Sequence, residues 1–468
     1  MAEVHNFPAS APYNSVAEQA VLGAILADNS VYDRLIGTLK ATDFHEPLHA
    51  ELYEAIENLI RDERRADLVT LTPTIKDKKI GEADALSYVQ TLPEFAPTSP
   101  EELWDYAREI TRYSAQRQIL ATATMLGQEA GRFGVNLLEV SDAAVRRIDE
   151  ALATTRARAI TNRPADEYIE QALEAYGKTG TGISTGLHNL DDLTGGLFPG
   201  EITFLGGRPG SGKTTLATQI ALNCALAKQG TLFFSLEMTG ITLGQRLASR
   251  LAWMPEREIP YFKFRRQTIT AEELERLRAA RQSLVNKPLV LEEQPALSLA
   301  QINGISRKTQ VQLEARGFPL KLIVVDYLTL IKMSDRYKGQ RVNEVTDLSA
   351  GLKELSRRMN VHVLCLHQLN RGVEGREDKR PQLHDLRDSG STEQDADNVI
   401  FTFREEYYIE REPDYDDPDK AADKAKRLDR AKNKMDVILA KQRMGAVGTK
   451  QFFSDIGSNV VADLATIF

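Results

Sequence analysis

The sequence predicts an α/β protein, with a mainly parallel sheet flanked by helices, preceded by a small all-α domain that contains a helical hairpin. Beyond about residue 182, short β-rich runs alternate with helical runs, which is typical of a parallel sheet covered on both faces. Before about residue 155, apolar residues recur instead at helical spacing, as they do in 52–60. We therefore expect three parts: an all-helical domain at 1–155, a linker with an amphipathic helix at 156–181, and the α/β domain at 182–468.

The composition excludes several classes of protein. The chain has 468 residues, of which 42% are hydrophobic and 27% charged, so it suits two or three globular domains and is not wholly disordered. Its longest nearly unbroken apolar stretch, 322–331, is much shorter than the ~20 residues that a membrane-spanning helix needs. The first residues include an acid and lack the apolar core of a secretory signal. We expect no membrane contact.

The cysteines and the charge balance bear on location and partners. Cys224 and Cys365 lack the spacing of a metal or redox site, so we expect a reducing compartment and a cytoplasmic protein. The 59 basic and 67 acidic residues give a net charge of −8, whereas proteins that coat nucleic acid are usually basic. Any contact with nucleic acid must therefore be narrow, or be built by several copies.

The N-terminal part contains a clear helix start. The run Ser99-Pro100-Glu101-Glu102 combines an N-cap, a first-turn proline and acids at the positive end of the helix dipole. Helical segments at about 103–129 and 135–152, with glycines between them, predict an antiparallel hairpin. His45 and His49 are four residues apart but lack a third ligand, so we expect half-exposed histidines rather than a metal site.

The linker is polar, basic and aperiodic at 154–166, and an amphipathic stretch follows at 166–178. This stretch is too short to be stable as an isolated helix, so its apolar face needs a cover such as a neighbouring subunit. In the α/β domain a helix is expected at 342–359, and the charged stretch 405–434 predicts a solvated loop leading into a helix. The expected strands are 201–207, 231–238, 320–328, 361–368, 398–403, 435–442 and 449–455.

A phosphate-binding loop lies between the first of these strands and a helical run. The sequence from Gly207 to Thr214 matches G-x-x-x-x-G-K-[ST] in the strand–loop–helix context that the motif requires. Glycines allow backbone N–H groups to surround phosphate oxygens, and the helix N-terminus adds positive potential. The expected nucleotide-binding residues are Gly207, Arg208, Pro209, Gly210, Ser211, Gly212, Lys213, Thr214 and Thr215.

Three polar residues end buried strands where the site of such a sheet is expected. Asp326 closes an apolar run and, with the Thr214 hydroxyl, is the natural partner of Mg²⁺ beside bound ATP. Glu237 follows a second apolar run and could polarise the attacking water, although acids at strand ends are also common on surfaces. Gln368 could hydrogen-bond the γ-phosphate, or be an ordinary polar strand end.

Taken in order, these motifs resemble one family over nearly the whole chain. The sequence has RPGSGKT, FFSLEM, LIVVDYL, the block 366–397 and AKQRMG in the order found in DnaB-like replicative DNA helicases of bacteria and phages. The N-terminal runs 12–26 and 43–56 are similar to the helical N-terminal domain of that family, which forms a collar. The resemblance implies a RecA-like P-loop ATPase core, a homohexameric ring with ATP between subunits, and 5′→3′ translocation on single-stranded DNA.

The resemblance also implies roles for single residues. Lys213 and Thr214 would bind nucleotide and Mg²⁺, Asp326 would be the Walker B acid, Glu237 the catalytic carboxylate and Gln368 the phosphate sensor. A primase, a helicase loader and a clamp-loader subunit of the replicative polymerase would be partners.

Two further groups are carried over in the same way. Arg443, with Lys441, would act on the ATP of the neighbouring subunit, although KQRMGAVG here departs from the usual KQRNGPTG in the following turn. Arg387, Asp388 and Gly390 match the DNA-gripping loop, six copies of which would line the pore with positive charge despite the acidic chain. The alternatives are a RecA-like recombinase, which forms filaments, and an ATP-dependent DNA-binding loader, which does not unwind DNA.

Overall fold

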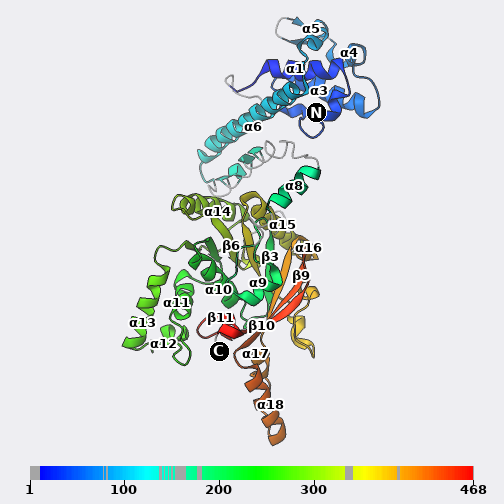
Figure 1. Cartoon of the computed structure of the whole chain (residues 1–468). Helices are drawn as coiled ribbons and strands as arrows, with labels where there is room; N and C mark the ends of the chain where they lie inside the picture. The colour runs from blue at the N-terminus through cyan, green and yellow to red at the C-terminus, as the bar shows by residue number, and fades with distance from the viewer. Residues whose placement is uncertain are drawn as a thin grey trace. The chain divides into compact units, whose positions relative to one another are not determined.

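The computed structural model describes residues 11–76, 78–80, 83–135, 140–141, 143–145, 147–148, 151–152, 165–175, 182–331, 341–386 and 390–466. The chain divides into two compact units, Met1–Ala172 and Leu173–Phe468 (Figure 1). None of the described helices is long and apolar enough to cross a membrane.

The first unit is helical, as predicted. Its helices are α1 (Ser15–Ala27), α2 (Val31–Leu35), α3 (Pro47–Arg61), α4 (Leu68–Ile75), α5 (Ala85–Thr91) and α6 (Pro100–Ala130). A short ladder of β1 (Lys79–Ile80) and β2 (Ala83–Asp84) was not expected. The Ser99 hydroxyl accepts a hydrogen bond from the Glu102 N–H at 3.2 Å, which confirms the predicted start of α6. The second arm of the predicted hairpin, 135–152, is described only in short pieces, of which 140–141, 143–145, 147–148 and 151–152 are helical.

His49 differs from the sequence expectation. It is only 1% exposed; its Nδ1 lies 2.7 Å from Glu18 Oε2, and its Nε2 lies 2.7 Å from the Tyr88 hydroxyl. The expectation of a half-exposed histidine is therefore wrong at this position, because a buried carboxylate on α1 pairs with it from 31 residues away. Within the described part of the chain, no group of three His, Cys, Asp or Glu side chains could hold a metal ion.

The second unit is built on a sheet with the strand order β11-β10-β9-β8-β3-β7-β6-β4-β5. Strands β8, β3, β7, β6, β4 and β5 are parallel, and β9, β10 and β11 continue the sheet antiparallel from β8. All seven predicted runs form strands, whereas β5 and β11 were not predicted. The bounds are β3 Ile202–Gly207, β4 Gly230–Ser235, β5 Leu289–Glu292, β6 Leu320–Asp326, β7 His362–Gln368, β8 Asn398–Phe403, β9 Lys434–Gln442, β10 Gly448–Asp455 and β11 Val460–Asp463.

Helices cover both faces of this sheet, so the predicted α/β fold is confirmed (Figure 1). On one face, α14 (Leu299–Glu314) and α15 (Arg341–Met359) bury Ile302 and Leu352 against the strands. On the other face, α10 (Lys213–Leu226) and α11 (Gly240–Leu251) bury Leu216 and Leu247. Burial on both faces explains why the central strands are apolar almost throughout.

The other helices lie around this core. Helix α9 (His188–Thr194) packs near β9 and β10, and α8 (Ala165–Ala175) lies within the predicted amphipathic linker. The side chains of Ile169 and Leu173 on α8 are 60% and 64% exposed, so these two apolar residues are largely uncovered in a single chain. The remaining helices are α12 (Phe262–Arg266), α13 (Ala271–Arg281), α16 (Gly390–Asp395), α17 (Glu405–Ile409) and α18 (Pro418–Ala431).

The predicted loop and helix at 405–434 form a charged arm made of α17 and α18, and Figure 1 shows α18 projecting beyond the sheet. Arg427 of α18 donates two hydrogen bonds to the carboxylate of Glu412, at 2.9 and 2.5 Å. Lys424 donates to the carbonyl oxygen of Glu412 at 2.8 Å. Ion pairs within the arm therefore stabilise it.

One buried histidine in the second unit has consequences for stability. His362 has no exposed surface; its Nδ1 lies 2.9 Å from the Phe198 carbonyl oxygen and its Nε2 lies 3.0 Å from Thr203 Oγ1. Burial lowers the pKa of His362 to about 4. An unfolded histidine titrates near pH ~6.5, so between about pH 6.5 and 4 the unfolded chain takes up a proton that the folded chain does not.

The free energy of unfolding should therefore fall as the pH decreases through this window. His362 alone contributes a slope of at most about 1.4 kcal/mol per pH unit. His362→Gln, which cannot take up this proton, should flatten that part of the profile in urea titrations between pH 7 and pH 4. His188→Gln, which changes an exposed histidine, is the control variant. Equal slopes in all three proteins would contradict the assignment.

Candidate functional site

The phosphate-binding loop lies at the carboxyl end of β3, between this strand and α10. Gly210 and Gly212 have φ values of +81° and +92°, which favour glycine, and the loop closes on itself through the Ser211 N–H and the Arg208 carbonyl oxygen at 3.1 Å. A Cβ on Gly210 would lie 2.1 Å from the ring of Tyr407 on α17, so the charged arm packs against the loop. Residues 207–212 therefore form a tight turn that presents backbone to a ligand.

A half-buried lysine and a buried aspartate lie beside this turn. The Lys213 Nζ donates to the Gly207 carbonyl oxygen at 2.6 Å, and the Thr214 hydroxyl donates to Asp326 Oδ2 at 3.0 Å. Burial lowers the pKa of Lys213 to about 8, and burial also raises the pKa of Asp326 to about 6. Each pKa shift reflects the loss of water around the charged form of the side chain. A polyanion beside Lys213 and a cation beside Asp326 would therefore stabilise the two charged forms. The residues therefore fit a nucleotide phosphate and Mg²⁺.

A cavity of about 280 Å³ joins these residues to the other predicted ones. Lys213, Thr214, Glu237, Asp326 and Gln368 all line it. Strand β4 ends at Ser235, so Glu237 lies two residues beyond the strand, in the loop before α11, whereas Gln368 is the last residue of β7. Both side chains belong to exposed residues, so a second molecule could reach them.

Arg208 also lines the cavity, but its guanidinium is directed elsewhere. Its Nε and Nη2 donate to Glu374 Oε1 at 2.9 and 2.7 Å, and its Nη1 donates to the Leu369 carbonyl oxygen at 2.8 Å. The Arg208 side chain therefore joins the phosphate-binding loop to the segment after β7.

Besides Met238 and Tyr327, which lie in two of the expected strand runs, sequence reasoning missed three residues of this cavity, which are Arg246 of α11, Tyr261 and Ile456. The Arg246 guanidinium lies 4.5 Å from the centre of the Tyr261 ring. A cationic and aromatic surface of this kind suits the stacking of a nucleobase. No local pattern could have found it, because the three residues come from a helix, a loop and the turn after β10.

Lys441 and Arg443 lie at the opposite end of the parallel strands, near the level where β3 begins. The Arg443 N–H donates to the Asp397 carbonyl oxygen at 2.9 Å, and the Asp397 N–H donates to the Ile202 carbonyl oxygen at 3.1 Å. Ile202 begins β3 and Gly207 ends it, so about 17 Å of strand separates the level of Arg443 from the phosphate-binding loop. Neither Lys441 nor Arg443 lines the nucleotide cavity of its own chain.

Of the residues expected to grip DNA, Arg387 and Asp388 lie outside the described residues, and Gly390 is the first residue of α16. The DNA-binding role of these three residues therefore remains a prediction from the sequence.

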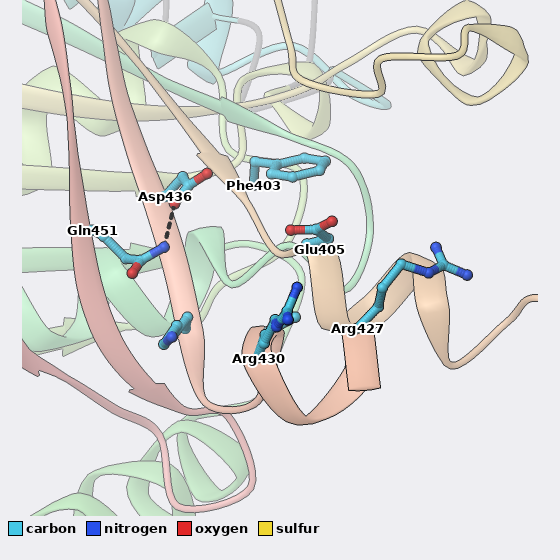
Figure 2. Close-up of a pocket in the computed structure, with 8 residues that line it drawn as sticks. Phe403, Glu405, Arg427, Arg430, Asp436 and Gln451 are labelled. Carbon is cyan, nitrogen blue, oxygen red and sulfur yellow. Dashed lines mark hydrogen bonds between the residues drawn. The ribbon is translucent and has the colours of Figure 1, made fainter. Parts of the chain in front are cut away.

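A second cavity, of about 200 Å³, lies where the charged arm meets the sheet (Figure 2). Arg427 and Arg430 line it from α18, and Glu405 lines it from α17. Figure 2 shows the hydrogen bond from Gln451 Nε2 to Asp436 Oδ1, which measures 3.1 Å, and Arg380 Nη2 donates to the other oxygen of Asp436 at 2.9 Å. Of the charged side chains that line this cavity, Arg427 and Asp436 therefore already have ionic partners within the chain.

Comparisons with known proteins agree with this geometry. The family of the DnaB-like helicase C-terminal domain matches residues 182–456, and that of the DnaB-like helicase N-terminal domain matches residues 10–112. The replicative DNA helicase DnaB of Rickettsia bellii is 32% identical, over 97% of this chain and 94% of that protein. The replicative DNA helicase DnaC of Bacillus subtilis is 33% identical, over 94% and 92%.

A solved structure extends the likeness to three dimensions. It is of a DnaB-like replicative helicase, described with its interactions with primase, and it superposes with a TM-score of 0.68 at 26% identity, covering 96% of this chain and all of that one. The matched families, the relatives and the fold all indicate the same function. The chain therefore belongs to the family of DnaB-like replicative DNA helicases and is an ATP-hydrolysing DNA helicase.

Proposed function

We propose that the protein works as a hexameric ring that moves 5′→3′ along single-stranded DNA. In this ring each nucleotide site would lie between two protomers, and Lys441 and Arg443 of one protomer would complete the site of the next. The observation that supports this is the separation of about 17 Å between the phosphate-binding loop and the level of Arg443 within one chain. An arginine so far from its own nucleotide cannot reach it, which supports action on the nucleotide of a neighbour.

Each residue of the cavity has a proposed part in hydrolysis. Lys213 neutralises charge on the β- and γ-phosphates, and Thr214 and Asp326 hold Mg²⁺, which when bound shields the phosphate oxygens. Glu237 accepts a proton from the attacking water, and Gln368 hydrogen-bonds the γ-phosphate and senses its loss. The neighbour's Arg443, with Lys441, stabilises the charge that develops on the transferred phosphoryl group.

The proposed grip on DNA rests on Arg387, Asp388 and Gly390. Backbone N–H groups and an arginine hold phosphates without reading bases, as a helicase that moves along any sequence requires. Six copies would concentrate basic charge at the ring axis, which reconciles DNA binding with a net charge of −8 per chain.

We extend the proposal to partners of the replication machinery. A primase is supported by the solved relative described with its interactions with primase. A helicase loader and a clamp-loader subunit rest on the family resemblance alone. The proposed place of action is the cytoplasm, where the free thiols of Cys224 and Cys365 would stay reduced.

A forked-duplex assay tests the proposal. With ATP and Mg²⁺, the protein should displace a strand from a fork with a 5′ tail at least about 10-fold faster than from a fork with only a 3′ tail, and chelation of Mg²⁺ should stop it. Mass photometry should give assemblies of about six times the 52.2 kDa of one chain. Filaments that pair homologous strands would indicate a recombinase, and ATP-dependent DNA binding without displacement would indicate a loader.

A further inference from the structure

Residues 393–397, which we call the support segment, lie between α15 and the end of β9. On the β9 side, the Lys441 ammonium donates to the Glu393 carbonyl oxygen. The Arg443 N–H donates to the Asp397 carbonyl oxygen at 2.9 Å, and the Arg443 Nη1 lies 3.6 Å from Asp397 Oδ1. Both residues assigned to the neighbour's nucleotide are therefore anchored to the support segment of their own chain.

Helix α15 holds the same segment from the other side. The Ser349 hydroxyl contacts the Asp395 carboxylate, and the Lys353 ammonium forms an ion pair with the Asp397 carboxylate. Ser349 and Lys353 are four residues apart, so they share one face of α15. The backbone N–H of Ile202, at the start of β3, also donates to Asp397 Oδ2 at 2.8 Å.

The α15 contacts of this segment are buried, whereas Arg443 is exposed and Lys441 is half-buried. Ser349 has no exposed surface, and Lys353 and Asp397 are 9% and 4% exposed. Separating such a pair would leave an uncompensated buried charge, so the pair holds one arrangement. The Arg443 side chain, in contrast, is 59% exposed, so its guanidinium can leave the surface while its backbone stays fixed.

We propose that Ser349, Lys353, Asp395 and Asp397 are positioning residues for the trans-acting pair Lys441 and Arg443. They hold the support segment so that the pair meets the nucleotide of the neighbouring protomer in a preset position. The inference rests on the proposed function, in which that pair acts in trans. Its physical basis is that a charge-stabilising group displaced by about 1 Å can cost up to about 100-fold in rate.

Ser349→Ala tests the proposal with little disturbance, because it removes one hydroxyl. We expect kcat for ATP hydrolysis to fall by about 10-fold, with KM and the affinity for a fluorescent ATP analogue unchanged. Ser356→Ala is a matched control. Ser356 lies on the same helix and is equally buried, and both hydroxyls donate to a carbonyl oxygen three residues earlier, at 2.9 Å for Ser349 and 2.7 Å for Ser356, but only the Ser349 hydroxyl also contacts the support segment. This control should keep the wild-type kcat, and identical kcat values for the two variants would overturn the proposal.

Mixed assemblies show in which protomer the effect acts. Arg443→Ala chains keep an intact nucleotide site, and Lys213→Ala chains keep an intact Arg443, so ATPase in the mixture comes from the interfaces that combine the two. Adding Ser349→Ala to the Lys213→Ala chains should lower this recovered activity by about 10-fold. Adding it to the Arg443→Ala chains should leave the recovered activity unchanged. A purely structural defect would lower the activity in both arrangements.

The outcomes separate this inference from the function on which it rests. If Arg443→Ala and Lys213→Ala chains recover no ATPase when mixed, the trans arrangement itself is overturned. If they recover ATPase and Ser349→Ala in the Lys213→Ala chain does not reduce it, the trans arrangement stands and the positioning role is overturned.

Discussion

Lys213→Ala should reduce ATP hydrolysis by at least about 10³-fold and abolish DNA unwinding, because it removes a preorganised charge from a site with little water. Lys213 is held beside the phosphate-binding loop by the Gly207 carbonyl oxygen at 2.6 Å, and burial lowers its pKa to about 8. Because the Lys213 ammonium is already desolvated without nucleotide, its charged form is strongly stabilised when phosphate oxygens bind beside it. Phosphate release at saturating ATP, with and without single-stranded DNA, measures the loss.

The control for this variant is Lys308→Ala, which removes an exposed lysine from α14. It should hydrolyse ATP at the wild-type rate. Both variants should keep the wild-type melting temperature in the absence of nucleotide, because the Lys213 side chain fills no apolar core. ATP hydrolysis by Lys213→Ala within about 10-fold of wild type would show that the phosphates bind elsewhere.

Arg443→Ala should lower kcat by about 10³-fold while nucleotide affinity and assembly remain intact. The reason is the position of Arg443, which lies near the first residue of β3, whereas the cavity of its own chain lies near the last residue of β3. Loss of its guanidinium therefore removes stabilisation of the reacting phosphoryl group but no contact within its own cavity. Stopped-flow binding of a fluorescent ATP analogue and steady-state hydrolysis measure the two quantities separately.

Met444→Ala distinguishes loss of the guanidinium from a disturbed turn. Met444 is 87% exposed in the same turn, so its truncation should change kcat by less than about 2-fold. If Met444→Ala were as inactive as Arg443→Ala, the geometry of the turn rather than the charge would be responsible. Normal hydrolysis by Arg443→Ala would exclude a catalytic role for this arginine.

The sequence predicts the central strands well, because burial on both faces makes each of them a continuous apolar run. Strand β8 begins and ends where its apolar run does, at Asn398 and Phe403. The edge strands β5 and β11 have four residues each, too few for a clear pattern, and β5 is only half-buried. Each of them pairs with a strand from another part of the chain, so neither can be predicted from its own residues alone.

Some residues of the candidate site could likewise be predicted from the sequence, and others could not. The phosphate-binding loop is local, so its spacing alone predicts it, and Asp326 and Gln368 follow because parallel strands end at one edge. Arg246 and Tyr261 could not be found, because a helix and a loop bring them together only in the folded chain. Nor could the contacts of Lys441 and Arg443 with residues 393–397 be predicted, because they join the end of β9 to the end of α16 and the two residues after it, almost 50 residues earlier.

In the proposed ring, ATP and the arginine that would act on the neighbour's ATP lie at opposite ends of the parallel strands, so each protomer would have a donor side and an acceptor side. Such copies would join head to tail, and a linear row would leave one acceptor without its donor. Only a closed ring would give every nucleotide site an arginine from a neighbouring protomer. Diluting the enzyme should accordingly silence hydrolysis well before any chain unfolds.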